Sequence, residues 1–310
     1  MLVIDRYLTD GDYSGALRAE FASWLTGAPK ALPCRLLHAG RAVRPVRGEG
    51  EILAAHARAI AGASGACTLL ELGAGRPEHA SALIEGLAPT LLSYVLVAAN
   101  AQTVQAGASA IAHRHPRLAV RAVVADFTRQ LHRLPARGGR LITLLGGYFA
   151  ALPPAERAAF LTQVRTTMEW DDCLLLGLDL VGEPRRPVAA ARAESEVTAE
   201  FNRNILQVAN RELGTDFRPG RFDHVVDRDP RRARIELRLR ARERQRVRVP
   251  GLGTAVELAA GEQIRTAVLS TFDLARIEGE LVAAGFALDR IWPGESGEYA
   301  VVLARPADQE

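Results

Sequence analysis

Five short apolar runs are separated by stretches of helical character, and this alternation limits the fold more than any other feature of the sequence. The runs are TLLEL (68–72), YVLVAA (94–99), LAVRAVV (118–124), RLITLL (140–145) and CLLLGLDL (173–180). Strands that are apolar on both faces are typical of parallel sheets covered by helices on both sides. The sequence therefore predicts an α/β domain built on a parallel sheet.

The segments between and after these runs indicate helices and a closing hairpin. PPAERAAFLTQVRTTM opens with Pro153, Pro154 and an early Glu156, which is typical of a helix start. Towards the C-terminus, LARIEGELVAAGFALDRIWP and GEYAVVLARP predict a helix and two closing strands. This is the layout of a class I methyltransferase-type Rossmann-like sheet with seven strands.

An insertion of different character interrupts this layout at about residues 182–271. It contains the long helical stretch EVTAEFNRNILQVANREL, followed by alternating strands as far as GEQIRTAVL. We therefore expect a Rossmann-like cofactor domain from residues 46–181 and 272–310. A second, smaller α+β domain on the substrate side is expected from residues 1–45 and 182–271. A structure with RIELRLRARERQRVRV in the parallel sheet would contradict this division.

Composition and the N-terminal residues indicate a water-soluble chain. Of the 310 residues, 48% are hydrophobic, which is ample for a buried core. No apolar run reaches the ~18–20 residues needed to span a bilayer, and MLVIDRYLTDGD lacks the features of a signal peptide. We expect a cytoplasmic protein with no membrane partner.

The cysteines do not suggest a metal site. Cys34, Cys67 and Cys173 have wide, irregular spacings that fit neither a metal-ligand pattern nor a disulfide framework. We expect free thiols in the core and no metal.

Arginine is concentrated in RPVR (44–47) and in residues 227–250. A basic stripe could contact phosphates, but the alternation in RIELRLRA favours a strand with one solvated arginine face. No aromatic residues interleave the arginines for stacking on bases, so we expect no nucleic-acid partner. Glu236 in this strand should pair with an arginine, because a buried carboxylate is seldom left alone.

A glycine turn follows the first apolar run, where ligands of open α/β sheets bind beyond the strand ends. In LLELGAG, Gly73 and Gly75 let the backbone approach a ligand where a Cβ would clash. After the third run, ADF (125–127) can hold an adenine by a hydrogen bond and stacking. After the second run, Asn100 stands where a ribose-binding carboxylate is usual, and it lacks the charge assistance that roughly doubles such a bond.

Longer motifs identify a family. The stretch 176–241, with FNRN, NREL, DF and RFDH in this order, resembles the histidine-specific S-adenosylmethionine-dependent methyltransferases. APKALP (28–33), LPPAERAAFL (152–161) and LAAGEQIRT (258–266) extend the likeness over almost the whole chain. The resemblance implies the two-domain fold above and S-adenosylmethionine as the cofactor.

The sequence departs from this family at cofactor positions. A lysine after the glycine turn becomes His79, and acidic residues of the second strand become Ala98 and Asn100. His79 is either a partner for the cofactor carboxylate or a solvated helix residue, and cofactor binding should be weakened or lost. The candidate cofactor-binding residues are Gly73, Ala74, Gly75, His79, Asn100, Asp126, Phe127 and Gly146.

Larger departures concern the substrate. The resemblance places an asparagine that binds the substrate amino acid at Ala151, a tyrosine at Ala191, and a Glu and a Ser that contact the imidazole at Ala267 and Leu269. A Tyr-Tyr-Pro segment that covers the substrate is not recognisable. Each deleted partner costs roughly 1–3 kcal/mol, so we expect no methylation of histidine. The candidate substrate-binding residues are Tyr148, Ala151, Ala191, Ala267 and Leu269, and no catalytic residue is identified.

Three further residues have structural expectations. His224 in RFDHVV matches the family, and a structural hydrogen bond is expected for it rather than catalysis. Trp170 and Trp292 are expected to be packing residues.

Two functions are open at this point. Methyl transfer requires mainly an aligned acceptor and sulfonium, so the chain could methylate a less polar small molecule, or transfer another group derived from the cofactor. Alternatively, the joint drift of cofactor and substrate positions favours a non-catalytic relative that serves as a partner subunit or a ligand-binding module. The partners under these hypotheses are a small-molecule acceptor, a second copy of the chain, or an intact methyltransferase homologue.

Overall fold

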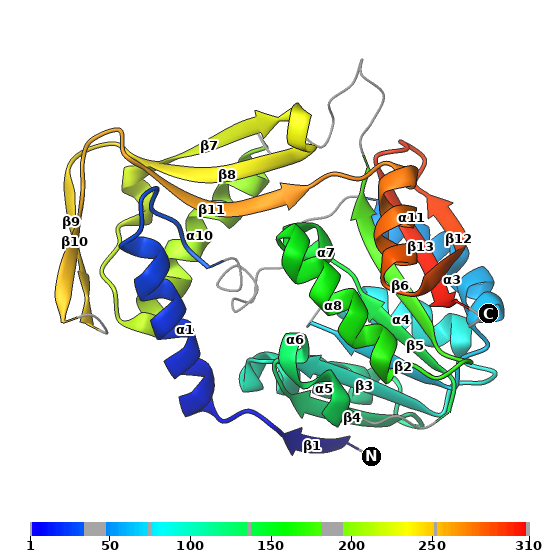
Figure 1. Cartoon of the computed structure of the whole chain (residues 1–310). Coiled ribbons are helices and arrows are strands. Elements are labelled where there is room, and N and C mark those ends of the chain that lie inside the picture. The colour runs from blue at the N-terminus through cyan, green and yellow to red at the C-terminus, as the bar shows by residue number, and fades with distance from the viewer. Residues whose placement is uncertain are drawn as a thin grey trace. The chain divides into compact units, whose positions relative to one another are not determined.

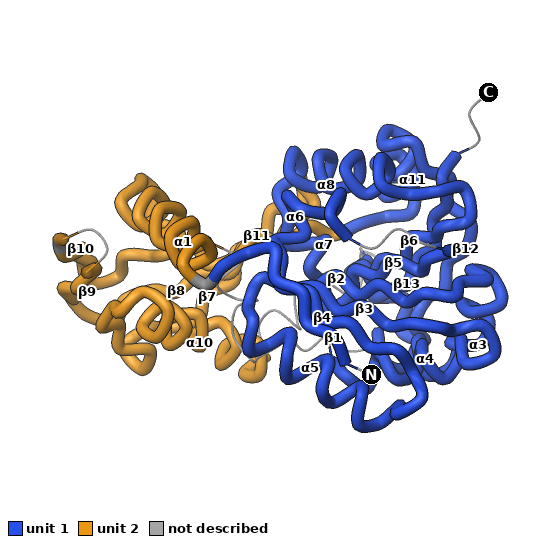
Figure 2. The backbone as a smooth tube through the Cα atoms, turned by 90° about the horizontal axis from the view of Figure 1, so that it is seen from below, with its two compact units in different colours: residues 1–9, 46–181, 272–310 blue, residues 10–45, 182–271 orange. Residues whose placement is uncertain are grey.

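The computed structural model describes residues 2–33, 48–73, 76–134, 138–180, 195–250 and 253–307. The chain divides into two compact units (Figure 2). Unit 1 comprises residues 1–9, 46–181 and 272–310, and unit 2 comprises residues 10–45 and 182–271. Residues 1–9, which the sequence analysis places in the second domain, belong to unit 1, because their strand pairs with the unit 1 sheet.

Unit 1 contains an eight-stranded sheet in the order β1-β4-β3-β2-β5-β6-β13-β12 (Figure 1). The strands β1 to β6 pair in parallel, whereas β13 is antiparallel to both of its neighbours. The predicted class I methyltransferase-type α/β fold is thus confirmed. The bounds are β1 (Leu2–Arg6), β2 (Thr68–Leu72), β3 (Ser93–Ala98), β4 (Ala119–Val124), β5 (Arg140–Leu144), β6 (Cys173–Asp179), β12 (Phe286–Pro293) and β13 (Tyr299–Pro306).

The edge strand β1 brings the total to eight where the sequence predicts seven. Its sequence, LVIDR, has only three apolar residues before a charged pair, and none of its residues is fully buried, as is typical of an edge strand. The pattern that revealed the central strands is therefore absent from it.

Helices cover both faces of this sheet, as the apolar strands predict. Leu70 and Leu72 of β2 belong to one apolar cluster with α7, α8 and α11. Leu69, which points to the opposite face, belongs to a second cluster with α3, α4 and α5. The helices of unit 1 are α3 (Glu49–Ser64), α4 (Pro77–Leu87), α5 (Ala101–Arg114), α6 (Phe127–Gln130), α7 (Tyr148–Ala151), α8 (Pro154–Thr167) and α11 (Leu274–Ala283).

Unit 2 is an α+β unit whose sheet is antiparallel. Its three-stranded sheet has the order β11-β8-β7, and β9 and β10 form a separate hairpin. RIELRLRA forms β8, so the arginine-rich strand stays out of the parallel sheet. The elements are α1 (Asp10–Leu25), α10 (Glu196–Leu213), β7 (Phe222–Asp229), β8 (Arg234–Ala241), β9 (Gln245–Val249), β10 (Thr254–Leu258) and β11 (Gln263–Ser270).

A buried amide joins α10 to all three strands of that sheet. The Asn202 Nδ2 donates to the carbonyl of Arg238 at 3.1 Å and lies 2.9 Å from Nδ1 of His224. Its Oδ1 accepts the Thr266 hydroxyl at 2.5 Å. The structural hydrogen bond expected of His224 is therefore present, and the FNRN motif has a packing role.

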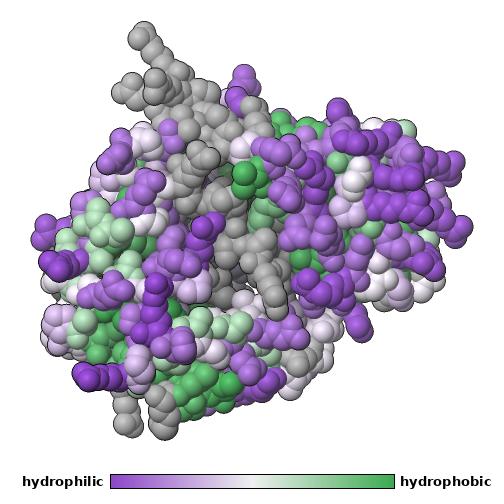
Figure 3. Space-filling model, turned by 180° about the vertical axis from the view of Figure 1, so that it is seen from behind, coloured by the Kyte–Doolittle hydropathy of each residue, from purple (hydrophilic) through white to green (hydrophobic). Residues whose placement is uncertain are grey.

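The face shown in Figure 3 is mostly polar where the structure describes it. In the space-filling view of Figure 3, hydrophilic side chains cover most of the described surface, and apolar ones form smaller patches.

Trp292 packs against the α3–α4–α5 side of the core, whereas Trp170 is 85% exposed, so the expectation that Trp170 packs was wrong. In the part of the chain that the structure describes, no helix is both long and apolar enough to cross a membrane.

Candidate functional site

The switch point of the unit 1 sheet lies between β2 and β5. The chain runs outward from β2 through β3 to β4, and then returns to β5 on the other side of β2. Ligands of open α/β sheets bind beyond the strand ends at such a point. The site is therefore built from the residues that follow β2, β3, β4 and β5.

Gly73, at the end of β2, leaves room for a ligand. Its φ of 83° lies in the left-handed region that favours glycine, and its N–H donates to the carbonyl of Val97 at 2.7 Å. A Cβ at this position would meet a single described atom within 4 Å, Cε1 of Phe127 at 3.9 Å. The glycine is thus required by the turn, and the space beside it suits close approach of a cofactor.

Phe127, beside this turn, packs against a second aromatic ring that follows β5. Gly146 and Gly147, after β5, have φ values of 76° and 75°, and α7 begins directly after them at Tyr148. The rings of Tyr148 and Phe127 pack with their centroids 5.2 Å apart. The structure thus brings together the ends of β4 and β5, with Phe127 next to Gly73.

Asn100 and Asp126 each cap a helix. Asn100 Oδ1 accepts from the N–H and hydroxyl of Thr103, at 2.9 and 3.0 Å, where α5 begins. Asp126 Oδ1 accepts from the N–H and hydroxyl of Thr128, at 3.1 and 2.5 Å, where α6 begins. Such caps contribute typically ~1 kcal/mol, and the sequence analysis did not predict them. Both caps lie at the strand ends where a cofactor is expected.

A buried carboxylate that the sequence analysis missed lies beside Gly146, the residue that follows β5. Glu49, the first residue of α3, is only 1% exposed. Its Oε1 accepts from the N–H of Gly146 at 2.8 Å and from the hydroxyl of Tyr299 at 2.5 Å. Its Oε2 lies 3.0 Å from Nδ1 of His79. An acidic residue in the first turn of a helix is so common that no local signal distinguishes Glu49.

A second buried carboxylate lies in β2, the strand that ends at the Gly73 turn. Glu71 in β2 accepts the Tyr94 hydroxyl of β3 at 2.6 Å. Burial raises the pKa of Tyr94 well above its usual range, and the negative charge of Glu71 raises it further. The phenol therefore stays protonated and acts as a hydrogen-bond donor.

The predicted substrate residues lie in both units. Ala151 is buried at the end of α7 in unit 1. Ala267 and Leu269 are buried in β11 of unit 2, opposite Leu237 and Ile235 of β8. Their role stays a prediction. Three other predicted site residues, Ala74, Gly75 and Ala191, lie outside the described residues.

No metal-binding group is found where the structure describes the chain: these residues contain no cluster of three His, Cys, Asp or Glu that could hold an ion. Burial raises the pKa of Cys173 to about 11, so this thiol is a protonated core residue. Cys67 is a partly exposed free thiol, and Cys34 lies outside the described residues.

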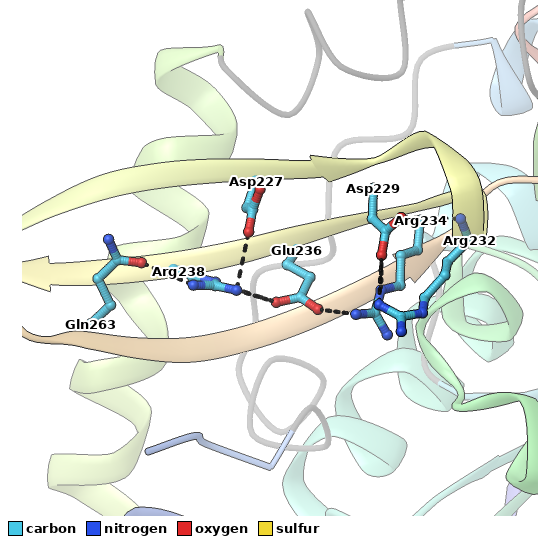
Figure 4. Close-up of polar contacts among 7 residues, drawn as sticks. All are labelled: Asp227, Asp229, Arg232, Arg234, Glu236, Arg238 and Gln263. Atoms are coloured by element: carbon cyan, nitrogen blue, oxygen red, sulfur yellow. Dashed lines mark hydrogen bonds and ion pairs between the residues drawn. The ribbon is translucent and has the colours of Figure 1, made fainter. Parts of the chain in front are cut away.

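The arginines of β8 are paired with carboxylates (Figure 4). Glu236, which is buried, bonds to Arg234 through Oε1 at 2.9 Å and to Arg238 through Oε2 at 2.7 Å. Arg238 also contacts Asp227 at 3.1 Å, and Arg234 lies 3.5 Å from Asp229. The predicted pairing of Glu236 is confirmed, and the charges on this face are largely balanced.

Comparison with known proteins agrees with the predicted resemblance. A family model described as histidine-specific methyltransferase, SAM-dependent, matches residues 44–306. The histidine N-alpha-methyltransferase of Mycolicibacterium smegmatis is 36% identical over 317 residues, covering 98% of this chain and 99% of that protein. The one from Mycobacterium tuberculosis is 38% identical over 303 residues, covering 93% and 94%.

Among solved structures, an S-adenosylmethionine-dependent methyltransferase from Clostridium acetobutylicum is similar, with 9% identity and a TM-score of 0.47, covering 83% of this chain and 92% of that one. The assignment to a family rests on the two sequence relatives, which cover 98% and 93% of the chain, and on the family model, which matches residues 44–306. This chain belongs to the family of histidine-specific, S-adenosylmethionine-dependent methyltransferases.

Proposed function

We propose that this protein is an S-adenosylmethionine-dependent methyltransferase that acts on a small molecule other than histidine, bound in a less polar pocket. The observation that carries the cofactor part is the left-handed turn at Gly73, where a Cβ would meet no described atom closer than Cε1 of Phe127 at 3.9 Å. A glycine turn at the switch point gives backbone access to the cofactor. The ring of Phe127 is itself only 6% exposed, so we assign the adenine to the strand end at Asp126 and Phe127 and not to an open ring face.

The acceptor part rests on side-chain chemistry. Ala151, Ala267 and Leu269 carry neither hydrogen-bond donors nor acceptors, although the family resemblance assigns polar residues to these three positions. Each missing partner costs a polar substrate roughly 1–3 kcal/mol. A zwitterionic amino acid would therefore bind poorly, whereas an acceptor with more apolar surface would not.

Histidine is nevertheless the acceptor to test first, because both curated relatives carry the name histidine N-alpha-methyltransferase. The test is transfer of a labelled methyl group from S-adenosylmethionine to histidine. We expect no turnover at the ordinary enzymatic rate of ~1 per second or more, and turnover at that rate would contradict the proposal.

A restoring variant makes this test sharper. The triple change Ala151→Asn, Ala267→Glu and Leu269→Ser puts back the polar residues that the resemblance implies. If lost polar contacts explain the substrate change, histidine affinity should rise by about tenfold or more for each regained partner that forms. Circular dichroism of the triple variant controls for folding, since Ala267 and Leu269 are buried.

Cofactor binding is tested separately, by calorimetry with S-adenosylmethionine and its demethylated product. Asn100→Asp keeps the helix cap and adds a charged acceptor for the ribose hydroxyls, so affinity should rise by up to about tenfold. If neither the wild type nor this variant binds either ligand, the enzyme hypothesis fails, and the non-catalytic partner subunit becomes the better hypothesis.

A further inference from the structure

Glu49 connects the two sides of the switch point. Gly146, whose N–H it accepts, follows β5, and His79, whose Nδ1 lies 3.0 Å from it, is the third residue of the helix that follows β2. In this ion-pair contact the carboxylate can only accept, so a hydrogen on Nδ1 of His79 is the arrangement that favours it. The hydroxyl of Tyr299 completes the set of donors.

Two glycines make room for this arrangement. A Cβ on Gly177 of β6 would collide with both the Tyr299 hydroxyl and Oε1 of Glu49. A Cβ on Gly50 would lie 2.9 Å from Nε2 of His79. The His79 ring therefore lies between two groups. Its Nδ1 faces the Glu49 carboxylate, and its Nε2 faces the backbone of α3 at Gly50, which has no side chain.

Strand order indicates which end of the cofactor lies near Glu49. Asn100 follows β3, and Asp126 and Phe127 follow β4, all on one side of β2. A cofactor whose adenosine lies over these strand ends must extend its amino-acid end past Gly73 towards β5. Gly146 and its partner Glu49 lie on that side.

We propose that Glu49 is a positioning residue for the amino-acid end of the cofactor, acting through the Gly146 backbone and the His79 imidazole. The inference rests on the proposed function, because it requires the chain to bind S-adenosylmethionine. It assigns no contact between Glu49 and the cofactor itself.

The experiment compares two ligands that differ at that end. S-adenosylhomocysteine has the amino-acid end, and 5′-methylthioadenosine lacks it. In Glu49→Gln, the amide oxygen can still accept from Gly146 and Tyr299, but the atom facing His79 becomes a donor. Calorimetry should show S-adenosylhomocysteine binding weakened about tenfold, as for a lost charge-assisted hydrogen bond. Binding of 5′-methylthioadenosine should stay within about twofold of the wild type.

A second variant keeps the test decisive if Glu49→Gln does not fold. Gly50→Ala adds one methyl group that displaces the His79 ring, and Ala favours a helix more than Gly does. Gly62→Ala in the same helix is the matched control, because no described atom outside the neighbouring helix backbone lies within 4 Å of its added Cβ. Gly50→Ala should weaken S-adenosylhomocysteine about threefold to tenfold, and Gly62→Ala should leave both ligands unchanged.

The outcomes separate the two claims. Equal weakening of both ligands, or none, would overturn the role of Glu49 while leaving the proposed function intact. If the wild-type chain binds neither ligand, the proposed function fails, and this inference fails with it.

Discussion

Two buried glutamates, one in each unit, have different kinds of partners for their carboxylates. Glu49 of unit 1 is held by a backbone N–H, a phenol and an imidazole, none of which has a permanent charge. Glu236 of unit 2 is held by two guanidinium groups of its own strand. The carboxylates are similarly buried, at 1% and 5% exposure.

The two sets of partners predict different effects when each glutamate is removed. The two arginines beside Glu236 are each 32% exposed, and each has a second carboxylate nearby, so this network has alternatives. The donors of Glu49 come from three separate elements, and two of them, Gly146 and His79, border the switch point. Removing Glu49 should therefore affect folding and the site together, whereas removing Glu236 should affect a local surface only.

The largest effect is expected for Glu49→Ala. It leaves the Gly146 N–H and the Tyr299 hydroxyl without their acceptor in a buried place, so the free energy of unfolding should fall by about 3–5 kcal/mol. Urea denaturation measures this. Glu51→Ala, an exposed change in the same helical turn, is the control and should cost less than about 1 kcal/mol. Equal losses would remove the distinction between Glu49 and an ordinary helix-start residue.

Gly177→Ala should have the next largest effect. Its methyl group overlaps the Tyr299 hydroxyl and the Glu49 carboxylate, and overpacking of this kind costs typically ~1–3 kcal/mol. In a double-mutant cycle, Tyr299→Phe should recover part of this loss, because it removes one of the two overlapping atoms. If the losses in unfolding free energy of the two single variants simply add in the double variant, the overlap with the Tyr299 hydroxyl is not the cause of the loss.

Glu236→Ala tests the other side of the comparison. Since Arg234 and Arg238 keep Asp229 and Asp227 as partners, the expected loss in the free energy of unfolding is about 1 kcal/mol or less. The loss should shrink at high salt, because exposed charges are screened. A loss as large as that for Glu49→Ala would show that the arginine network is as indispensable as the unit 1 cluster.

A pH effect of smaller size is expected at a third carboxylate. Burial raises the pKa of Glu280, but the hydrogen bond and charge of Arg157, with those of Arg276, outweigh this and lower it below the ordinary value. A lowered pKa in the folded state contributes stability that is present above the unfolded pKa of about 4.3 and is lost as the pH falls through the folded pKa. Unfolding free energies at acidic pH should thus fall less steeply in Glu280→Gln. Identical slopes would contradict the predicted linkage.

Most of the fold follows from the sequence, for an identifiable reason. The central strands are apolar on both faces, so their sequences alone indicate burial in a parallel sheet. The edge strand β1 was not predicted because its apolar run is only three residues long and the strand is partly exposed. The expectation for Trp170 was wrong for a related reason. A residue type indicates how often such side chains are buried, but it does not indicate where in the fold a given side chain lies.

The candidate site was predicted only in part. Gly73 and Phe127 have local signals, a glycine turn and an ADF motif after a strand, and the structure places them together. The capping roles of Asn100 and Asp126 were overlooked, although a polar residue before a helix is a known sign of a cap. Glu49 has no comparable signal, because its neighbours in the sequence do not contact its carboxylate.

The contacts of Glu236 can be predicted from the sequence alone, whereas those of Glu49 depend on the tertiary structure. Glu236 pairs with residues two positions away on either side, and side chains at that spacing share one face of a strand, so the alternation alone predicts the contact. The Glu49 partners Gly146 and Tyr299 are 97 and 250 positions away. Their contact depends on the order in which the strands join the sheet, because only that order brings the ends of β5, β6 and β13 to the start of α3.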